Sequence, residues 1–492
     1  MTRLDRTTLA GLPADIARPS FERAEVGVGV VHLGIGAFHR AHQAVYTDDV
    51  LNQTAGDWAI CGVSLQSARV RDQMASQDGL YTVVERGAKG ERLRVIGAVK
   101  EVVFAPENPG ALLARMADPA VKVVTLTVTE KGYCHDPATG RLQGDHPDIA
   151  HDLANLDRPR TAISYLVASL AQRRKQGLAP FTVLSCDNIP ENGKTVRAIA
   201  LAFAERVDPG LAAWIAEAAS FPCTMVDRIV PATTEDDLAM VEARLGHRDE
   251  AAVVGEPFRQ WVIEDRFTCS RPAWDRVGAE MVADVAPFEE MKLRLLNGSH
   301  STLAYLGYLA GFDTISETVR QPAFVRLIRR LMDEEVTPTL HVPPGTDLGI
   351  YKRALIERFA NPALKHRTWQ IAMDGSQKLP QRLLATIRDR LDAGGSVRHL
   401  ALGVAAWMRY ATGIDEAARP IDVRDPLAGR LRRIAEDAGG EPATLANAML
   451  HLHEVFGDDL PRAEPFRKAV TEALVSLYSK GARQTVEECS GT

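Results

Sequence analysis

A lysine, an asparagine and a histidine stand close together in an apolar, helix-like stretch, residues 289–301 (EEMKLRLLNGSHS). At about 100° per residue of an α-helix, Glu289, Lys292 and His300 lie within roughly 80° of one another. Asn297 lies about 140° from Lys292. A lysine among leucines is hard to protonate because its charged form is poorly solvated, and such a lysine suits a general base. The other interpretation is a solvated helix face whose lysine extends its charged end into water.

A glycine turn, residues 34–42 (GIGAFHRAH), directly follows a β-rich run. A turn between a strand and a helix can hold a pyrophosphate on its backbone amides and on the helix N-terminus. The third glycine of the usual GxGxxG pattern is replaced by His39, so a bare turn stays open as an alternative. His39 and His42 lack a suitably placed third ligand, and no metal site is predicted. The predicted cofactor-binding residues here are Gly34, Gly36, Ala37, Phe38, His39 and Arg40.

Polar side chains also stand at the ends of later strand-like runs. Thr127, Thr129 and Glu130 close one run, and Asn188 follows another. In open α/β sheets the carboxyl ends of the strands line the ligand crevice, although turn formation explains an asparagine equally well. Val226 and Asp227 lie in an apolar run, where Asp227 and the next arginine form either a structural ion pair or part of a site.

The choice between NAD and NADP is not settled by the sequence. An acid at the end of the second strand normally binds the ribose hydroxyls of NAD. Residues 62–67 (GVSLQS) contain no acid, and Arg69 and Arg71 follow.

A polar, cation-bearing patch occurs in residues 365–370 (KHRTWQ) and 374–382 (DGSQKLPQR). Arginine and lysine at such positions suit a carboxylate or a phosphate of a substrate. Arg367, Lys378 and Arg382 are therefore the predicted substrate-binding cations, with a solvated charge run as the alternative.

The elements that position these residues change in kind along the chain. Strand-like runs at 28–33, 58–63, 121–128 and 181–185 alternate with helix-like runs such as 111–116 and 162–175, which indicates a doubly wound α/β domain. Beyond about residue 288 the patterns are helical. We expect a Rossmann-like domain over residues 1–284 and a mainly α-helical substrate and catalytic domain over residues 285–492. The expected later helices are 291–310, 322–335, 379–393, 397–412, 427–438 and 465–480.

Composition narrows the class of protein. A chain of 492 residues is too long for one simple core, and its net charge of −6 argues against nucleic acid as a partner. Its 6 cysteines are scattered without a CxxC pair, which fits reduced thiols better than disulfides or a structural zinc. Without an apolar signal core or a run of about 18 apolar residues, a soluble cytoplasmic protein with no membrane partner is expected.

Taken together, these motifs resemble the polyol-specific long-chain dehydrogenase/reductase family, also called the mannitol dehydrogenase family. The resemblance extends from residue 32 to residue 382, and the KLRLLNGSHS element is its most specific part. The segments FPCTMVDRIVP, EPFRQWVIED and HRTWQIAMDGSQKLPQR are closest to the fructuronate reductase branch. The segments that carry the resemblance are HLGIGAFHRAH, LTVTEKGY, SCDNIPENG, MVDRIVP, EPFRQWVIED, MKLRLLNGSHS and DGSQKLPQR.

The resemblance implies a metal-independent hydride transfer with a nicotinamide cofactor. In such enzymes the lysine matching Lys292 is the general acid/base, and the asparagines matching Asn188 and Asn297 hold the oxygen that becomes an alkoxide. The histidine matching His300 orients a neighbouring substrate hydroxyl. The acid matching Glu289 is associated with proton passage to solvent. An acidic position near the substrate matches Asp227, and the site is expected in the cleft between the domains.

For the substrate, the resemblance implies D-fructuronate reduced by NADH to D-mannonate, with NADP not excluded. The alternative is mannitol 2-dehydrogenase, from D-mannitol to D-fructose, or another neutral polyol dehydrogenase. A catalytically silent nucleotide sensor is a third hypothesis, and the predicted general base speaks against it because mere binding has no use for one. A monomer or a weak homo-oligomer is expected.

Overall fold

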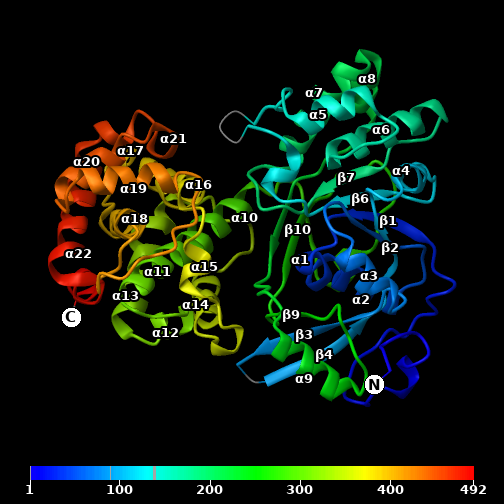
Figure 1. Cartoon of the computed structure of the whole chain (residues 1–492), viewed down its shortest axis with the longest axis horizontal. Helices are drawn as coiled ribbons and strands as arrows, with labels where there is room; N and C mark the ends of the chain where they lie inside the picture. The colour runs from blue at the N-terminus through cyan, green and yellow to red at the C-terminus, as the bar shows by residue number, and fades with distance from the viewer. Residues whose placement is uncertain (1, 89, 137–139, 492) are drawn as a thin grey trace. The chain divides into compact units, whose positions relative to one another are not determined.

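A computed structural model of the chain describes residues 2–88, 90–136 and 140–491 (Figure 1). The chain forms two compact units, Met1–Ala286 and Pro287–Thr492. The first has a parallel sheet covered by helices, and the described part of the second is built from helices. The predicted fold class is therefore confirmed. Within the described residues, no helix has the length and apolar character needed to cross a membrane.

The main sheet of the first unit has five parallel strands in the order β5–β2–β1–β6–β7. Strands β2 and β6 flank β1, so the strand order reverses between β1 and β6. In open α/β sheets, ligands bind at the carboxyl ends of the strands at such a switch point. The four predicted runs correspond to β1, β2, β6 and β7, and β5 was missed. The strands are β1 (Val28–Leu33), β2 (Ala59–Ser64), β5 (Val99–Phe104), β6 (Val123–Leu126) and β7 (Thr182–Ser185).

Helices cover both faces of this sheet (Figure 1). On one face Val31 and Leu33 of β1 share a core with Leu113 of α4 and with residues of α6 and α7. On the other face Val30 packs with Ala44 of α2. Because both faces are buried, the strands are continuous apolar runs. The helices are α1 (Ala37–Ala41), α2 (Gln43–Gln53), α3 (Arg69–Ala75), α4 (Pro109–Ala117), α5 (Pro147–Ala154), α6 (Ala162–Lys175), α7 (Asn192–Val207), α8 (Pro209–Ala218) and α9 (Glu235–Leu245).

Local side chains set where some of these helices begin and end. Thr161 caps α6, since its hydroxyl accepts a hydrogen bond from the backbone N–H of Ser164 at 3.2 Å. Thr234 and Asp237 form a reciprocal capping box at the start of α9. Gly246 ends α9 with a left-handed φ of 74°, a conformation that glycine adopts without steric cost.

Two small sheets complete the first unit, in the orders β4–β3–β9 and β11–β10–β8. The apolar run that holds Val226 and Asp227 forms β8, whose last residue, Asp227, pairs with Gln260 of β10. Asp227 therefore stands at the end of a strand outside the main sheet. The strands are β3 (Tyr81–Gly87), β4 (Gly90–Ile96), β8 (Thr224–Asp227), β9 (Val253–Gly255), β10 (Gln260–Glu264) and β11 (Glu280–Val282).

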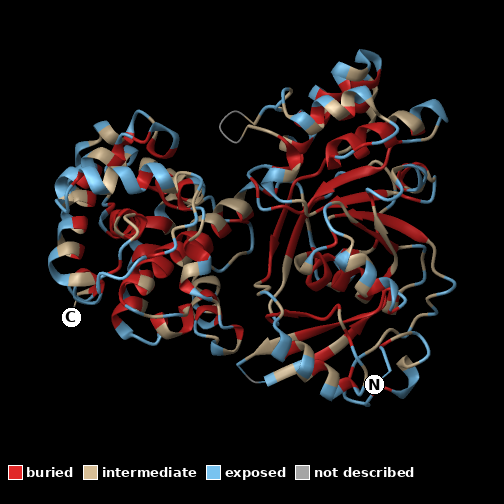
Figure 2. Ribbon diagram, in the orientation of Figure 1, coloured by how far each residue is buried: buried red, intermediate tan, exposed pale blue. Residues whose placement is uncertain are grey.

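The second unit packs its helices around the buried helix α11, which contacts α15 and α18 (Figure 2). Π-helical turns interrupt several predicted long helices: η4 (Lys292–Asn297), η5 (Leu331–Val336) and η8 (Pro380–Leu384). Helix α22 bends at Gly481. The helices are α10 (Ala286–Met291), α11 (Gly298–Leu309), α12 (Ile315–Val319), α13 (Pro322–Arg330), α14 (Leu348–Phe359), α15 (Thr368–Ala372), α16 (Gly375–Leu379), α17 (Ala385–Asp392), α18 (Arg398–Ala411), α19 (Ala428–Asp437), α20 (Pro442–Leu450), α21 (His453–Phe456) and α22 (Glu464–Ser490).

Candidate active site

The carboxyl ends of β1 and β6 are tied together at the switch point of the main sheet. The backbone N–H of Thr127 donates to Leu33 O at 2.9 Å, and its hydroxyl donates to Gly34 O at 2.8 Å. Gly34 has a φ of 96°, and a Cβ there would lie 2.1 Å from Thr127 O. Only glycine fits this close approach of two chain segments. The edge therefore depends on Gly34 for its shape.

The next residues of the turn leave room for a ligand. Gly36 is exposed, and a Cβ there would meet only Gly34 O, at 3.8 Å. Ala37 and Phe38, the first residues of α1, are half-buried. An open glycine before the start of a helix fits the pyrophosphate of a dinucleotide, because the backbone can approach it closely. The structure thus keeps Gly34, Gly36, Ala37 and Phe38 together at the accessible edge.

The side chains of His39 and Arg40 lie beneath this edge and are buried. The His39 ring is fully buried and stacks on His32, with 3.4 Å between ring centroids. Burial lowers the pKa of His39 well below its usual value and that of His32 to about 3. Arg40 donates through Nε to Gly36 O at 3.3 Å and stacks over Tyr81. Both side chains support the turn from inside the core.

The weaker interpretation of His39 and His42 as a metal pair gains no support from their contacts. Nε2 of His42 lies 2.8 Å from Gln260 O, and the His42 ring stacks on Phe38. Across the residues that the structure describes, no three His, Cys, Asp or Glu side chains gather as metal ligands.

The segments after β6 and β7 lie at the same edge of the sheet as the glycine turn. Thr129 and Glu130 are exposed, and so is Asn188, three residues beyond the end of β7. The buried carboxylate of Asp187 accepts the backbone N–H groups of Val128 and Thr129, at 3.0 and 2.8 Å. Burial raises the pKa of Asp187, and these hydrogen bonds oppose that rise. Nothing in the sequence distinguished Asp187 from an ordinary turn residue.

Strand β8 is joined to this edge through Asn192. The side-chain amide of Asn192 donates to Thr224 O at 2.9 Å, and its oxygen accepts the backbone N–H of Thr224 at 2.9 Å. Asp227 and Val226 are each only 5% exposed. The side chain of Val226 packs in the aromatic core around Trp261.

In the second unit, two of the predicted catalytic residues, Lys292 and Asn297, lie on a π-helical turn and not on a regular α-helix. The backbone N–H of Gly298 donates to Leu293 O, five residues earlier. A π-helical turn contains more residues than the 3.6 of an α-helical turn, so each residue advances by less than 100° around the axis. Lys292 and Asn297 therefore lie closer to the same side than the expected separation of about 140°. Π-turns of this kind concentrate at functional sites.

The π-turn η4 encloses its polar residues. Lys292 is 7% exposed and Asn297 is 8% exposed. Lys292 is therefore not the solvated lysine of the alternative interpretation. Glu289, on α10, is half-buried. A Cβ on Gly298 would lie 2.7 Å from Arg382 O, so a glycine here allows η4 and η8 to pack closely.

His300, on α11, is held between other rings. Its imidazole stacks on Phe359 at 5.3 Å and meets His366 edge-on at 4.7 Å. Its Nε2 is shielded from solvent and has no hydrogen-bond partner among the described residues. Burial lowers the pKa of His300 well below its usual value, and the nearby His366 and three cationic side chains lower it further. These cations are Arg382, Arg358 and Lys378.

The structure separates the three predicted substrate-binding cations. Lys378 and Arg382 lie within electrostatic range of His300 and are held in place, Lys378 by Met373 O at 2.5 Å and Arg382 by Ser301 Oγ at 3.0 Å. Arg367 is exposed and precedes α15. The largely buried Arg358 of α14 was missed, because nothing in its helical pattern distinguished it from a surface charge.

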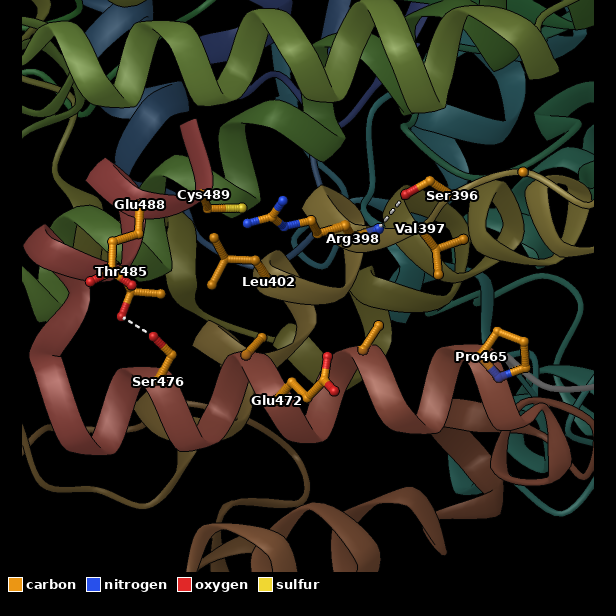
Figure 3. Close-up of a pocket in the computed structure, with 13 residues that line it drawn as sticks. Ser396, Val397, Arg398, Leu402, Pro465, Glu472, Ser476, Thr485, Glu488 and Cys489 are labelled. Atoms are coloured by element: carbon orange, nitrogen blue, oxygen red, sulfur yellow. Dashed lines mark hydrogen bonds between the residues drawn. The ribbon is translucent and has the colours of Figure 1, made fainter. Parts of the chain in front are cut away.

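A cavity of about 560 Å³ lies elsewhere in the second unit, between α18 and α22 (Figure 3). Arg398, Glu472 and Glu488 line it together with small and apolar side chains, and Ser476 and Thr485 join their hydroxyls at 3.0 Å. The described residues that line this cavity include none of the predicted catalytic or substrate-binding residues. The candidate site is therefore distinct from it.

Comparison with known proteins covers both units. Residues 28–276 match the family described as mannitol dehydrogenase Rossmann domain, and residues 284–478 match the mannitol dehydrogenase C-terminal domain. The chain is 52% identical over 485 residues to D-mannonate oxidoreductase of Escherichia coli (strain K12), which covers 98% of this chain and 99% of that relative. It is 43% identical over 480 residues to a mannitol 2-dehydrogenase of Phaeosphaeria nodorum, or 96% and 83% of the two chains. The solved mannitol 2-dehydrogenase of Pseudomonas fluorescens, in a ternary complex with NAD and D-mannitol, aligns with a TM-score of 0.90, 40% identity and 99% coverage of both chains.

Proposed function

The chain belongs to the mannitol dehydrogenase family, and from this membership we propose that it is an NAD-dependent oxidoreductase that interconverts D-fructuronate and D-mannonate. The observation that carries the proposal is the enclosed π-turn η4, which holds Lys292 and Asn297 on one side next to α11. A buried lysine beside an amide donor suits proton exchange with an alcohol oxygen. The 52% identity to a D-mannonate oxidoreductase supports the substrate class.

The residues then divide the chemistry among them. NADH, when held at the glycine turn, would supply the hydride for the ketone carbon. Negative charge develops on the oxygen, and the amides of Asn188 and Asn297 stabilise it. Lys292 delivers the proton during reduction and removes it during oxidation. His300, neutral because burial lowers its pKa, accepts or donates a hydrogen bond to a neighbouring hydroxyl of the substrate.

Proton exchange between the enclosed Lys292 and solvent needs a relay. We assign it to Glu289, which is half-buried one helical turn before Lys292. Asp227, at the end of β8, is proposed to bind a substrate hydroxyl.

The glycine turn is the proposed cofactor site. Gly34, Gly36, Ala37 and Phe38 present backbone at the switch point, and Thr127, Thr129 and Glu130 stand at the end of the neighbouring strand. NAD is the favoured cofactor because the solved mannitol 2-dehydrogenase, 40% identical to this chain, is in a complex with NAD. Of the two arginines after β2, Arg71 is paired with Glu107 and Arg69 is exposed, so the test below includes NADP.

The cations around His300 support an acidic substrate. Lys378 and Arg382, with Arg358 adding positive charge, form a region that favours a carboxylate at the far end of the sugar. Arg367 is less suited to this role because it is exposed before α15. We therefore propose that Lys378 and Arg382 bind the carboxylate.

A neutral polyol is the second candidate substrate, favoured by the 43% and 40% identities to mannitol 2-dehydrogenases. The discriminating experiment measures oxidation of D-mannonate, D-mannitol, D-arabinitol and D-sorbitol by the purified protein, with NAD and with NADP. The proposal predicts the highest kcat/KM for D-mannonate with NAD. A higher kcat/KM for D-mannitol would replace it with the neutral polyol assignment, and no turnover of any of them would contradict both.

A further inference from the structure

Asp187 has no part in the chemistry proposed above, yet it is the most connected carboxylate at the edge of the main sheet. It lies two residues beyond the end of β7, precedes Asn188 and is 8% exposed. Besides the N–H groups of Val128 and Thr129, it accepts the hydroxyl of Tyr133 at 2.6 Å. One side chain therefore holds the segment after β6 on both sides of Glu130.

That segment contains an unusual backbone conformation. Thr129 has a φ of 63° and a ψ of 166°, a region that residues with a Cβ rarely adopt. Such a conformation persists only where the surroundings over-determine it, and it concentrates at functional sites. The two N–H groups that Asp187 accepts belong to the peptide bonds that enter Val128 and Thr129, immediately before the unusual conformation. Asp187 is thus placed to hold this conformation.

The backbone of Asp187 is fixed as well. Asn192 donates to Asp187 O at 3.1 Å and to Thr224 O of β8 at 2.9 Å. The Tyr133 hydroxyl also lies 2.8 Å from the hydroxyl of Ser185, the last residue of β7. Since Asn188 is the next residue, the network that fixes Asp187 also fixes the start of the turn that carries Asn188.

We propose that Asp187 is a positioning residue that locks the segment 127–130 and Asn188 into one rigid edge for the cofactor and the substrate oxygen. The inference rests on the function proposed above. Asp187 acts through Thr129 and Asn188 and does not itself touch the reacting atoms. A site whose groups are held before binding loses less conformational freedom when the ligand arrives.

The test is a fluorescence titration of the full-length protein with NADH, which reports cofactor binding without turnover. Asp187→Asn keeps the shape of the side chain but replaces one carboxylate oxygen with an NH₂ group. This new donor then faces the N–H and O–H donors that the carboxylate accepted. We expect the Kd for NADH to rise about tenfold. Tyr133→Phe removes only one of the three hydrogen bonds, and a rise of about threefold is expected. If Asp187→Asn fails to fold, the NADH titration of Tyr133→Phe still tests the inference.

Asp152 of α5 offers a matched control. It is also buried and accepts two backbone N–H groups and one hydroxyl, from Arg160 and Thr161, each at 2.9 Å. It joins α5 to the residues just before α6 and not to the sheet edge. Asp152→Asn should lower the Tm by as much as Asp187→Asn and leave the Kd for NADH within twofold of the wild type.

A second control exploits the φ of Thr129. Glycine adopts a positive φ without steric cost, so a Thr129→Gly background needs Asp187 less. In that background Asp187→Asn should raise the Kd for NADH by less than threefold. Equal effects of Asp187→Asn in both backgrounds, or an equal loss of NADH affinity in Asp152→Asn, would overturn the inference while the proposed function stands. Absence of NADH binding by the wild type would overturn the proposed function and this inference with it.

Discussion

The edge of the main sheet and the π-turn η4 present polar groups in two different ways. At the sheet edge, strand register brings Gly34, Thr127 and Asn188 together. The polar groups that a ligand can reach there belong to the backbone and to side chains. In η4, a locally widened helix turns the side chains of Lys292 and Asn297 to one side and encloses them. The first arrangement suits binding of a large cofactor, and the second suits proton transfer away from water. The two regions should therefore fail in different ways when they are changed.

The largest effect is expected from Lys292→Ala. Removal of a positioned general acid/base typically costs a factor of 10² to 10⁴ in rate, and we expect kcat to fall about 1,000-fold. Affinity for NADH should stay within twofold of the wild type. The control is Lys352→Ala, which removes a lysine of α14 that pairs with Asp333, and its kcat should be unchanged. Unchanged turnover in Lys292→Ala would refute the role assigned to η4.

The next effect concerns the cations around His300. Arg382→Gln and Lys378→Gln should each lower kcat/KM for D-fructuronate about 10- to 100-fold, because a hydrogen bond to a charged group is worth about 1.5–3 kcal/mol. The value for D-fructose should change little, and Arg367→Gln should change neither. Steady-state kinetics on the two sugars measure this difference. Equal losses of kcat/KM on both sugars would refute the assignment of Lys378 and Arg382 as the residues that bind the substrate carboxylate.

Gly298→Ala tests how tightly η4 is packed. The added Cβ would lie 2.7 Å from Arg382 O, so η4 and η8 must move apart. Overpacking of this kind costs about 1–3 kcal/mol of unfolding free energy. We expect a stability loss of that size, measured by urea unfolding, together with a lower kcat and an unchanged Kd for NADH. Gly429→Ala is the control, because a Cβ there meets nothing within 4 Å.

A smaller effect, shared by both regions, is acid sensitivity. Burial lowers the pKa of His32 in the first unit to about 3 and that of His366 in the second to about 4. A histidine in the unfolded chain has a pKa near 6.5. As the pH falls below this value, these histidines therefore become protonated in the unfolded state while they stay neutral in the folded state. Stability is therefore full above about pH 6.5 and falls as the pH drops toward these folded values. Urea unfolding at pH 7 and pH 5 should differ by roughly 1–2 kcal/mol per buried histidine.

A replacement of His366 by glutamine isolates one of these contributions. His366→Gln should make the unfolding free energy less dependent on pH between 7 and 5, whatever its effect at pH 7. The same slope in the variant and the wild type would exclude His366 as a source of the acid sensitivity.

Much of the fold could be predicted because its signals are local. The apolar runs of β1, β2, β6 and β7 and the periodic pattern of α6 depend on neighbours in sequence. The short strands of the two small sheets, such as β9 (Val253–Gly255), depend on distant partners and carried no comparable signal. The π-turn η4 was also missed, because α- and π-helical turns share the same apolar pattern and differ only in backbone hydrogen bonding.

The residues of the candidate site show the same difference between local signals and contacts that form only on folding. Gly34 could be predicted because a strand followed by GxG has a backbone explanation. The core role of His39 could not, since it requires the His32 ring, which becomes its neighbour only when β1 and α1 pack. Arg358 and Asp187 were missed for the same reason, because only the folded chain brings them to His300 and Thr129.

The most direct test of the division between the two regions compares Gly34→Ala with Lys292→Ala in one series of measurements. The Cβ of the first variant would lie 2.1 Å from Thr127 O, at a φ of 96°, and should deform the cofactor edge. The Kd for NADH and the kcat at saturating NADH are measured for both. The account predicts weaker NADH binding with largely retained kcat in Gly34→Ala, and lost kcat with retained binding in Lys292→Ala. Loss of both properties in both variants, or retained turnover in Lys292→Ala, would contradict it.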